Sequence, residues 1–511
     1  MDSSLNARRR SAELRSTAEE RVDVLVVGLG ATGAGAALDA ASRGLSVAAI
    51  DAHDLAFGTS RWSSKMVHGG LRYLAKGQVD VAYESAVERG ILLRNTHLVR
   101  AHPYLLPLTP SVSRGQAALV MAGYRLGDGL RAAARTPRGL LPGPSRIAAS
   151  RALGLAPVLD GRGLRGGLLS WDGRLLDDAR LVVAVARTAA AHGARVLTRC
   201  RAVRLTGRGA RVRDELTGAE FDIRAEVVIN ATGVWAGGLD PAVKLRPSRG
   251  THLVLGPLPG LRAGLHVPIP GETNRFALVL PQPDGRVHVG LTDVPVDGPV
   301  PDVPEAPEED VRTLLEVLNG VLEVPVTREA VAGVYAGLRP LLAAEGRTAD
   351  ISRRHAVLPG DGVVTVVGGK LTTYRRMAED AVDRAVALAR LTAGPCRTAR
   401  IPLVGAGPVP AGVPARLAAR YGAEAAAVRA LAEAYPEPAG LGITTGELLW
   451  SVRHEGALDE GDLLDRRTRI GLVAGDRAAA LAAAREALGE GLSEGLGESR
   501  DEGSNGNTPG Q

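Results

Sequence analysis

The sequence predicts an α/β protein with a parallel sheet near its N-terminus, and three observations support this fold class. Val22–Val27 is a continuous apolar run, as in a strand that is buried on both faces. Gly28-Leu29-Gly30-Ala31-Thr32-Gly33 follows directly and opens an Ala-rich helix that ends near Arg43. A second strand, Ser46–Ile50, leads into Asp51. This order of strand, turn, helix and strand is that of a Rossmann-like unit.

The glycines and the acid of this unit suit a bound dinucleotide. Gly28 permits the tight turn, Gly30 lets the backbone approach a pyrophosphate, and Gly33 lets the helix pack closely on the strand. The helix N-terminus supplies N–H donors and the positive end of its dipole. Asp51 can accept hydrogen bonds from a ribose. A glycine-rich turn alone is weak evidence in a chain with 64 glycines, but the complete unit predicts dinucleotide binding.

Two later segments repeat the order of strand and glycine turn, and they favour FAD over NAD. The strand Ala225–Asn230 runs into Ala231-Thr232-Gly233, and the strand Val363–Val367 runs into Gly368-Gly369-Lys370-Leu371-Thr372. In many flavoproteins a late strand and turn return to the cofactor. A helix N-terminus there can face the flavin N1–C2=O edge, where negative charge collects on reduction. We therefore expect FAD as the cofactor.

The rest of the chain is expected to form the following elements. Helices are predicted over residues 80–101, 177–191 and about 373–390, and strands over residues 195–206, 276–280 and 287–291. Residues 102–165 contain many Pro and Gly and predict only short elements, residues 294–307 predict a connection, and residues 410–488 are Ala-rich and predict helices. Residues 1–20 predict a flexible arm, and residues 489–511 a disordered tail.

Composition narrows the class of partner. The net charge of +6 favours anionic partners such as phosphorylated substrates, phosphate-bearing cofactors or an acidic membrane surface. Nucleic acid is disfavoured because no aromatic residues are interleaved with the scattered arginines. Cys200 and Cys396 have neither disulfide nor metal-ligand spacing. We therefore expect no metal site, and we expect the protein to lie in a reducing compartment. With neither a signal peptide nor a spanning run in view, we expect a cytoplasmic protein that can lie on a membrane face.

Several motifs together carry a family resemblance. Thr59–Leu74 (TSRWSSKMVHGGLRYL), Tyr335–Leu341 (YAGLRPL) and Gly368–Tyr374 (GGKLTTY) resemble the signatures of FAD-dependent glycerol-3-phosphate dehydrogenases of the aerobic, respiratory type. Residues 446–455 and 462–469 resemble the C-terminal helical domain of that family, and the match covers roughly residues 20–475. The departures are Asp51 where Glu is usual, Gln282 where Trp is common, and Arg354-His355 in place of an acidic–aromatic pair.

The resemblance implies a discontinuous Rossmann-like FAD-binding domain, a mixed β-sheet substrate domain like that of glycine and D-amino acid oxidases, and a C-terminal helical domain. The expected boundaries follow. The FAD-binding domain comprises residues 21–95, 160–240 and 330–395, the substrate domain residues 96–159 and 241–329, and the helical domain residues 396–488.

The resemblance also implies an activity. Members oxidise sn-glycerol 3-phosphate to dihydroxyacetone phosphate with non-covalent FAD, and a membrane quinone reoxidises the flavin. The implied location is the inner face of the cell membrane, bound peripherally, and the oligomeric state is left open, a homodimer included. One alternative is a glycerol-3-phosphate oxidase that uses O2 and forms H2O2. A second is a flavin-binding scaffold that has lost catalysis.

Matching positions give the candidate site residues. Cations for the substrate phosphate are Arg72, Arg339, Arg353 and Lys370, of which Arg339 and Lys370 are expected nearest to it, and Tyr73 is expected to contact the substrate. The cofactor-binding candidates are Gly28, Gly30, Gly33, Asp51, Thr59, Ser60, Ser64, His68, Gly69, Val203, Ala231, Thr232, Gly233, Gly369, Lys370, Leu371 and Thr372.

Oxidation of an alcohol also needs a group that accepts the hydroxyl proton. His252, in Arg249-Gly250-Thr251-His252-Leu253-Val254, matches the position of the family's candidate base, and an ordinary histidine pKa would suit that task near neutral pH. The catalytic candidates are therefore His252, Arg339 and Lys370. If His252 is not the base, an Arg-polarised water or His355 is the alternative.

Overall fold

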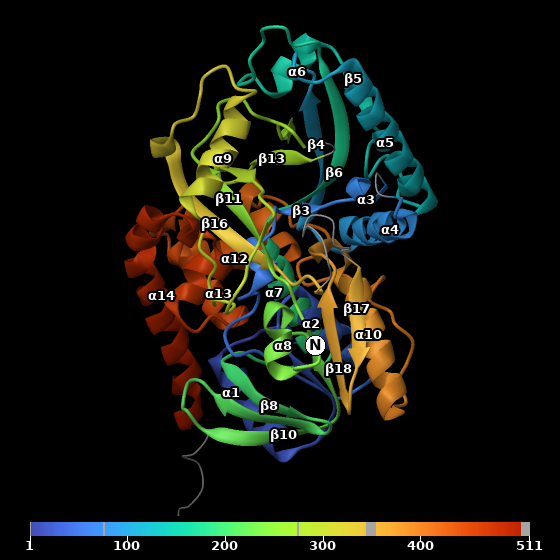
Figure 1. Ribbon diagram of the computed structural model, residues 1–511. Helices are drawn as coiled ribbons and strands as arrows, with labels where there is room; N and C mark the ends of the chain where they lie inside the picture. The colour runs from blue at the N-terminus through green and yellow to red at the C-terminus, as the bar shows by residue number, and fades with distance from the viewer. Residues whose placement is uncertain (1, 75–76, 273–274, 344–353, 502–511) are drawn as a thin grey trace, which may run out of the picture.

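Two β-sheets and a group of C-terminal helices make up the molecule. The computed structural model describes residues 2–74, 77–272, 275–343 and 354–501, without the side chains of Arg72 and of residues 494–501. In Figure 1 the first sheet lies in the lower half and the second in the upper half, and the C-terminal helices pack along the left side. The chain passes several times between the two sheets.

The first sheet has a parallel centre. Its strands lie in the order β17 (His355–Pro359), β18 (Val363–Gly368), β10 (Glu220–Asn230), β1 (Val22–Val27), β2 (Val47–Ile50) and β7 (Arg195–Leu197), and β8 (Cys200–Thr206) and β9 (Gly209–Asp214) extend β10 in antiparallel pairing. Strand β1 is parallel to both of its neighbours, β2 and β10. Because parallel strands end at the same edge, the turns after β1, β10 and β18 meet there.

Three helices cover one face of this sheet. The central helix α2 (Ala31–Ser42) packs between α7 (Asp178–Ala191) and α10 (Tyr374–Ala389). Its small residues allow close contact: a Cβ on Gly35 would lie 2.9 Å from the Tyr374 ring. Asp177 caps α7 by accepting hydrogen bonds from the first backbone N–H groups of the helix. The apolar residues between these helices and the sheet form one core.

The second sheet is mixed. Its strands lie in the order β15 (Val294–Pro295), β11 (Ser248–Leu255), β14 (Val287–Gly290), β13 (Phe276–Pro281), β12 (Gly264–Pro268), β4 (Val99–Pro107), β6 (Gly167–Leu175) and β3 (Met66–Val67), with β16 (Val331–Arg339) on β11 and β5 (Ser145–Ile147) on β6. Helices α9 (Glu308–Asn319) and α6 (Ala149–Leu155) pack their apolar residues against it. Helices α3 (Leu71–Leu74), α4 (Val79–Asn95) and α5 (Arg114–Ala133) lie together at its other side (Figure 1).

Strand pairing corrects two of the expected domain boundaries. Strand β6 falls in the range 160–240 and β16 in the range 330–395, both of which were assigned to the FAD-binding domain. Hydrogen bonds place both strands in the second sheet, β6 on β4 and β16 on β11. The prediction was wrong here because the residue pattern of a strand does not reveal which sheet it joins.

The expected flexible arm is also wrong. Residues Ala7–Glu19 form helix α1, which Asn6 caps by accepting a hydrogen bond from the Arg9 backbone N–H. Arg10 is buried, where its Nε donates to the carbonyl of Thr198 and its Nη2 lies 2.5 Å from Asp214. The polar composition of this segment suggested disorder. The partners that hold it in place lie about two hundred positions further along the chain, so the segment's own sequence does not reveal them.

Two further expectations for irregular chain were wrong. Residues 114–133, within the stretch expected to hold only short elements, form the helix α5, which Ser113 caps. At the C-terminus, helix α14 spans Ala474–Asp501 and so occupies the first part of the expected tail. The remaining tail, residues 502–511, lies outside the described part of the chain.

The C-terminal part is helical, as expected. It consists of α11 (Ala415–Tyr421), α12 (Ala425–Ala434), the short hairpin of β19 (Pro438–Gly440) and β20 (Ile443–Thr444), α13 (Thr445–His454), a π-helical turn over Asp462–Arg467, and α14. Thr444 and Glu447 form a capping box at the start of α13. Helices α13 and α14 pack their apolar faces together.

A buried ionic junction joins this helical part to the first sheet. Asp54, just after β2, accepts hydrogen bonds from Arg466 Nε at 2.6 Å and from Arg467 Nη1 and Nη2 at 2.7 and 2.8 Å. Asp54 and the Arg467 side chain are fully buried. Glu455 lies 2.6 Å from Arg180 of α7, and its backbone carbonyl accepts from Arg467. Buried charges persist only when they are paired in this way.

We expect the junction to be essential for stability. Arg467→Met leaves part of the Asp54 charge unpaired in the interior and should lower the free energy of unfolding by about 3–5 kcal/mol. Chemical denaturation followed by circular dichroism measures the change. Arg328→Met, which removes an exposed pair with Glu308, is the matched control and should change the free energy of unfolding far less. Equal losses in both variants would contradict the structural role given to Arg467.

Candidate active site

A large cavity opens where the two sheets meet, and most of the predicted site residues line it. Its volume is about 1000 Å³. The wall on the first sheet consists of the turns after β1, β2, β10 and β18. The facing wall comes from the second sheet and from helices α3 and α5. The cavity therefore lies at the carboxyl edge of the parallel strands, where nucleotides bind in such sheets.

The glycine loop after β1 is packed too tightly for side chains. Gly28 has φ +98°, and a Cβ there would lie 2.6 Å from the carbonyl oxygen of Ala231. A Cβ on Gly33 would lie 1.7 Å from the carbonyl oxygen of Gly28, so Gly33 serves helix packing and does not line the cavity. Gly30 does line it. The backbone at Gly30 and the N-terminus of α2 thus face the cavity, as an anion site requires.

Asp51 braces this loop from the end of β2. Its Oδ2 accepts a hydrogen bond from the backbone N–H of Leu29 at 2.7 Å, and its Oδ1 from that of His53 at 2.8 Å. Burial raises the pKa of Asp51 to about 6, against the effect of these two bonds. The carboxylate lines the cavity and keeps lone pairs for a ribose hydroxyl.

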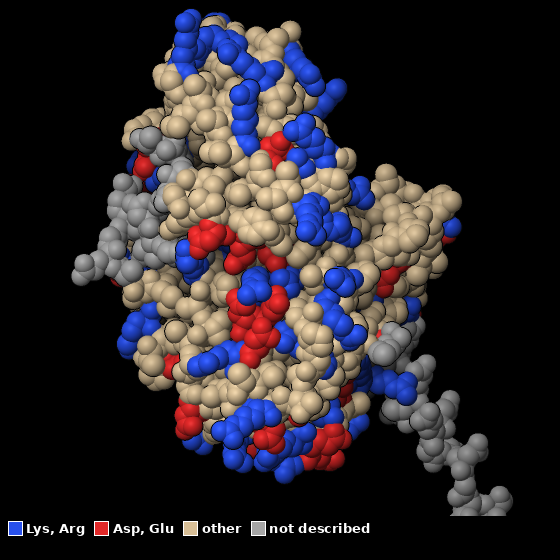
Figure 2. Space-filling view, turned by 90° about the vertical axis from the view of Figure 1, so that its right-hand side faces the viewer, with Lys and Arg blue, Asp and Glu red and all other residues tan. Residues whose placement is uncertain are grey.

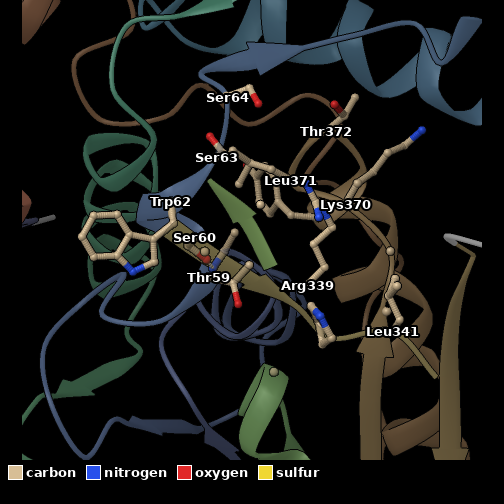
Figure 3. Close-up of a pocket in the computed structure, with 18 of the residues that line it drawn as sticks. Thr59, Ser60, Trp62, Ser63, Ser64, Arg339, Leu341, Lys370, Leu371 and Thr372 are labelled. Carbon is tan, nitrogen blue, oxygen red and sulfur yellow. Dashed lines mark hydrogen bonds between the residues drawn. The ribbon is translucent and has the colours of Figure 1, made fainter. Parts of the chain in front are cut away.

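Thr59, Ser60, Trp62, Ser63 and Ser64 line the cavity between the two sheets (Figure 3). Each hydroxyl here is fixed by a partner from another element. Thr59 Oγ1 donates to the carbonyl of Leu338, Ser60 Oγ accepts from the backbone N–H of Ala31, Ser63 Oγ donates to Asp178, and Ser64 Oγ lies 2.9 Å from His252 Nε2. Beneath them, Lys65 Nζ is buried 2.8 Å from Asp178 Oδ2.

The two late turns close the opposite side. Gly233 at φ +61°, and Gly368 and Gly369 at +80° and +68°, make the turns after β10 and β18. Ala231, Thr232 and Gly233 line the cavity, as do Gly369, Lys370, Leu371 and Thr372, the last three just before α10. His68 also lines it, and its backbone N–H donates to Thr372 Oγ1 at 3.3 Å.

Besides Gly33, two predicted cofactor residues lie outside the cavity lining. The Val203 side chain is 48% exposed on β8 and does not line the cavity, whereas Arg201 and Ala202 do. The register of β8 shifts between Ala202 and Arg204, which turns Val203 outward and which the sequence does not reveal. Gly69 is also outside the lining: a Cβ there would lie 2.5 Å from Arg89 Nη1, so this glycine admits an arginine side chain.

The predicted cations fall into two groups. Arg339 and Lys370 line the cavity, and Figure 3 shows Arg339 between the 59–64 loop and the turn at Lys370. Arg339 Nη1 donates to Ser248 Oγ at 3.2 Å and Nη2 to the Thr292 carbonyl at 3.2 Å. Lys370 Nζ donates to Ser85 Oγ and lies 4.3 Å from the ring centroid of Tyr73, another lining residue. The Arg72 side chain and Arg353 lie outside the described part of the chain.

His252 differs from the expectation. The imidazole is 1% exposed, stacks on Tyr335 with 4.7 Å between ring centroids, and is hydrogen-bonded to the lining residue Ser64. Burial, together with the charges of Lys65 and Arg339, lowers the pKa of His252 to about 3. The expectation of an ordinary histidine pKa was therefore wrong. The other candidate, His355, is 2.8 Å from Asp380 and does not line the cavity.

Several lining residues were not predicted from the sequence. Arg275 lines the cavity and pairs with Glu272 at 2.8 Å. Asp172 accepts from Arg89 at 2.7 Å, and Tyr124 and Leu126 belong to the unexpected helix α5. The apolar residues at helical spacing in residues 114–133 were the one available signal, and the many glycines of that segment obscured it.

Comparison with known proteins identifies what this arrangement is similar to. A family model described as FAD dependent oxidoreductase matches residues 23–375, and one described as the C-terminal domain of alpha-glycerophosphate oxidase matches residues 396–493. The chain is 54% identical to glycerol-3-phosphate dehydrogenase 1 of Mycobacterium tuberculosis, over 94% of this chain and 97% of that protein. It is 34% identical to a mitochondrial glycerol-3-phosphate dehydrogenase of Arabidopsis thaliana, over 92% and 82%.

Solved structures agree. The glycerol-3-phosphate dehydrogenase from Bacillus halodurans, complexed with FAD, is 27% identical to this chain with a TM-score of 0.73. The similarity covers 97% of this chain and 97% of that one. Glycine oxidase from Geobacillus kaustophilus is 20% identical with a TM-score of 0.51, covering 71% of this chain and 95% of that one, and shares the fold. The predicted fold class is confirmed.

The similarities confirm FAD as the cofactor, and the cavity fits it. The α2 N-terminus and the backbone at Gly30 would hold the pyrophosphate, and Asp51 the ribose. The turn at Gly369 and the start of α10 would hold the flavin ring system. These positions lie along one continuous cavity.

Gly30 provides a direct test of this cradle. In Gly30→Val the Cβ would lie 3.0 Å from Ser60 Oγ and its methyl groups would enter the cavity, so the purified protein should lose its visible flavin absorbance. Gly139→Val is the control, because a Cβ there meets nothing within 4 Å, and it should keep its flavin. Full flavin content in Gly30→Val would contradict this placement of the pyrophosphate.

Proposed function

The chain belongs to the family of FAD-dependent glycerol-3-phosphate dehydrogenases, and we propose that it oxidises sn-glycerol 3-phosphate to dihydroxyacetone phosphate in this cavity. One observation carries the proposal: two cations, Arg339 and Lys370, line the same cavity as Ser64, whose hydroxyl is hydrogen-bonded to His252. A phosphate dianion and a neighbouring secondary alcohol need these two kinds of group.

The two cations suit a phosphate in different ways. Arg339 is oriented by Ser248, by the Thr292 carbonyl and, at 3.4 Å, by Asp293, which fixes the plane of its guanidinium group. It also lies against Gly250, where a Cβ would be 2.3 Å from Nη2. A planar, oriented guanidinium binds phosphate oxygens in bidentate fashion. The Lys370 ammonium, placed over Tyr73, adds a point charge.

Ser64 and His252 suit the proton of the substrate hydroxyl. Ser64 Oγ faces the cavity and His252 Nε2 lies 2.9 Å behind it. Bound FAD supplies the acceptor for the hydride from C2 of the substrate. Loss of hydride makes the remaining hydroxyl strongly acidic, so a neutral imidazole accepts its proton through Ser64 even though burial disfavours the charged form.

We propose a membrane quinone as the final electron acceptor, with the protein bound peripherally at the inner face of the membrane. Helix α5 supports this proposal. Leu119 and Leu126 are 59% and 63% exposed on its outer side and also border the cavity, and Arg114 and Arg125 lie on the same helix. Such a helix suits the interface of an anionic bilayer.

Figure 2 shows the side of the molecule on which α5 lies. Its upper part is mostly free of Asp and Glu and is bordered by Lys and Arg, whereas acidic residues gather lower down. Among the described residues, no helix combines the length and the apolar character that a bilayer crossing demands. An oxidase that uses O2 is the competing reading, and it predicts H2O2 formation without any need for lipid.

Arg339→Ala tests the substrate assignment. Loss of this charge-assisted contact should raise the KM for glycerol 3-phosphate by roughly 10- to 150-fold, equivalent to about 1.5–3 kcal/mol. Activity toward unphosphorylated glycerol should change far less. Steady-state kinetics with both substrates measure the difference, and Arg162→Ala, at an exposed site outside the cavity, is the control. Equal losses with both substrates would make Arg339 structural.

The pKa of His252 sets the expected pH dependence. Its folded pKa of about 3 lies below the ordinary value, so the imidazole is neutral and ready to accept a proton at every pH above about 4. Flavin reduction by substrate, followed by anaerobic stopped flow, should therefore show no histidine-like rise between about pH 5 and pH 8. His252→Gln should slow it by ~10²–10⁴-fold. A rise centred near pH 6.5 that disappears in His252→Gln would contradict the structure.

Membrane contact through α5 is tested with vesicles. Leu119→Glu with Leu126→Glu should weaken co-sedimentation with phosphatidylglycerol vesicles. The double substitution replaces two apolar side chains that would enter the bilayer with negative charges that the anionic lipid repels. Added salt should weaken binding of the unchanged protein, since screening shortens electrostatic reach to about 8 Å at physiological ionic strength. Leu216→Glu with Val324→Glu, at equally exposed positions outside the cavity wall, is the matched control. Equal effects of the two pairs would place the contact elsewhere.

A further inference from the structure

The cavity wall formed by α5 and the β12–β13 hairpin differs in chemistry from the wall that carries Arg339 and Lys370. Its lining is largely apolar, and consists of Leu119, Val120, Leu126, Ile269, Phe276 and Leu278. Two charged residues border it, and both are paired: Arg275 with Glu272, and Asp172 with Arg89. This wall is therefore unsuited to a phosphate and suited to an uncharged, apolar ring.

One polar pair is built into this apolar wall. Tyr124 of α5 and His266 of β12 both line the cavity, and Tyr124 Oη is 3.0 Å from His266 Nδ1. The His266 ring is held between other aromatic side chains: it stacks on Tyr104 at 5.5 Å and lies 6.0 Å from Phe276, measured between ring centroids. Gly264 admits the Tyr104 ring, because a Cβ there would lie 2.6 Å from it.

The hydrogen bond with Tyr124 occupies Nδ1 of His266 and leaves Nε2 available to a ligand. The Tyr124 hydroxyl lies 3.0 Å from Nδ1, and the imidazole also lines the cavity. A phenol that donates to Nδ1 leaves the proton of the neutral ring on Nε2. Burial lowers the pKa of His266 to about 4, so near neutral pH the ring is an uncharged donor.

We propose that His266 and Tyr124 form the binding site for the electron acceptor, in which His266 Nε2–H donates a hydrogen bond to a carbonyl oxygen of a quinone. The inference rests on the proposed function, because it takes a quinone as the acceptor. An uncharged donor in an apolar, aromatic wall matches a quinone, which is a flat ring with carbonyl oxygens and no charge. The exposed Leu119 and Leu126 continue this wall to the protein surface, where such a ring would enter.

Helix α3 connects this site with the substrate wall. The Tyr73 ring lies beneath Lys370 Nζ at 4.3 Å, and Leu71 packs against α5, where a Cβ on Gly127 would lie 2.3 Å from Leu71 Cδ2. Leu71, Tyr124 and Phe276 belong to one apolar cluster. The acceptor site and the phosphate site are thus on two sides of one short helix, and both open to the same cavity.

The test separates the oxidative step from the reductive one. The flavin of the intact enzyme is reduced anaerobically with stoichiometric dithionite and then mixed, in a stopped-flow instrument, with a water-soluble short-chain benzoquinone. His266→Phe keeps a ring and removes the donor, and it should lower the second-order rate constant of reoxidation about 3- to 10-fold. Tyr124→Phe should act in the same direction. Reoxidation by ferricyanide, which needs no carbonyl site, should stay within about twofold of the unchanged enzyme.

His102→Phe is the matched control. His102 also lies in the second sheet, 5.5 Å from the Tyr104 ring, and outside the cavity lining. The inference fails if His102→Phe and His266→Phe slow quinone reoxidation equally, or if quinone and ferricyanide are affected alike. It also fails if the unchanged enzyme is reoxidised by O2 and not by quinone. Reduction by glycerol 3-phosphate is measured separately, and its absence would refute the substrate assignment alone.

Discussion

The structure depends on the pairing of buried charge along the loop that follows β2. Asp54 is held by Arg466 and Arg467 of the C-terminal part, and Lys65 by Asp178 of α7. Between these two anchors lie the hydroxyls of residues 59–64, which face the cavity. An unpaired charge in the interior is costly, so each of these charges needs its partner from another part of the chain. The helical part, the first sheet and this part of the cavity wall therefore stabilise one another. This explains why a domain remote from the substrate is still part of the site's support.

The cavity combines two chemistries that would conflict at one point. Oriented cations at Arg339 and Lys370 suit an anionic substrate, and the apolar wall with its neutral His266 suits an uncharged ring. Burial keeps both His252 and His266, the two histidines to which we assign these tasks, neutral. A neutral imidazole can accept a proton at one wall and donate a hydrogen bond at the other. The different surroundings of His252 and His266 therefore suit the same residue type to two different tasks.

Much of the nucleotide-binding half could be predicted because its requirements are local. Gly28, Gly30 and Gly33 are needed where a strand turns directly into a helix, and that need shows in six consecutive residues. Val203 and Gly69 show the limit of such matching. A register shift in β8 turns the Val203 side chain outward, and the missing Cβ of Gly69 accommodates Arg89. Neither cause is visible without the neighbouring strand or helix.

By itself the sequence determined the glycine loop, the acid at Asp51, the late turns at Gly233 and Gly369, and the family signature, because each depends on residues adjacent in the chain. Tertiary structure alone decided which sheet β6 and β16 join, that residues 7–19 are an anchored helix, and that His252 lies behind Ser64. It also decided that Tyr124 meets His266, 142 positions away. Burial and pairing between distant segments set these outcomes, and their free energies arise only once those segments are packed together.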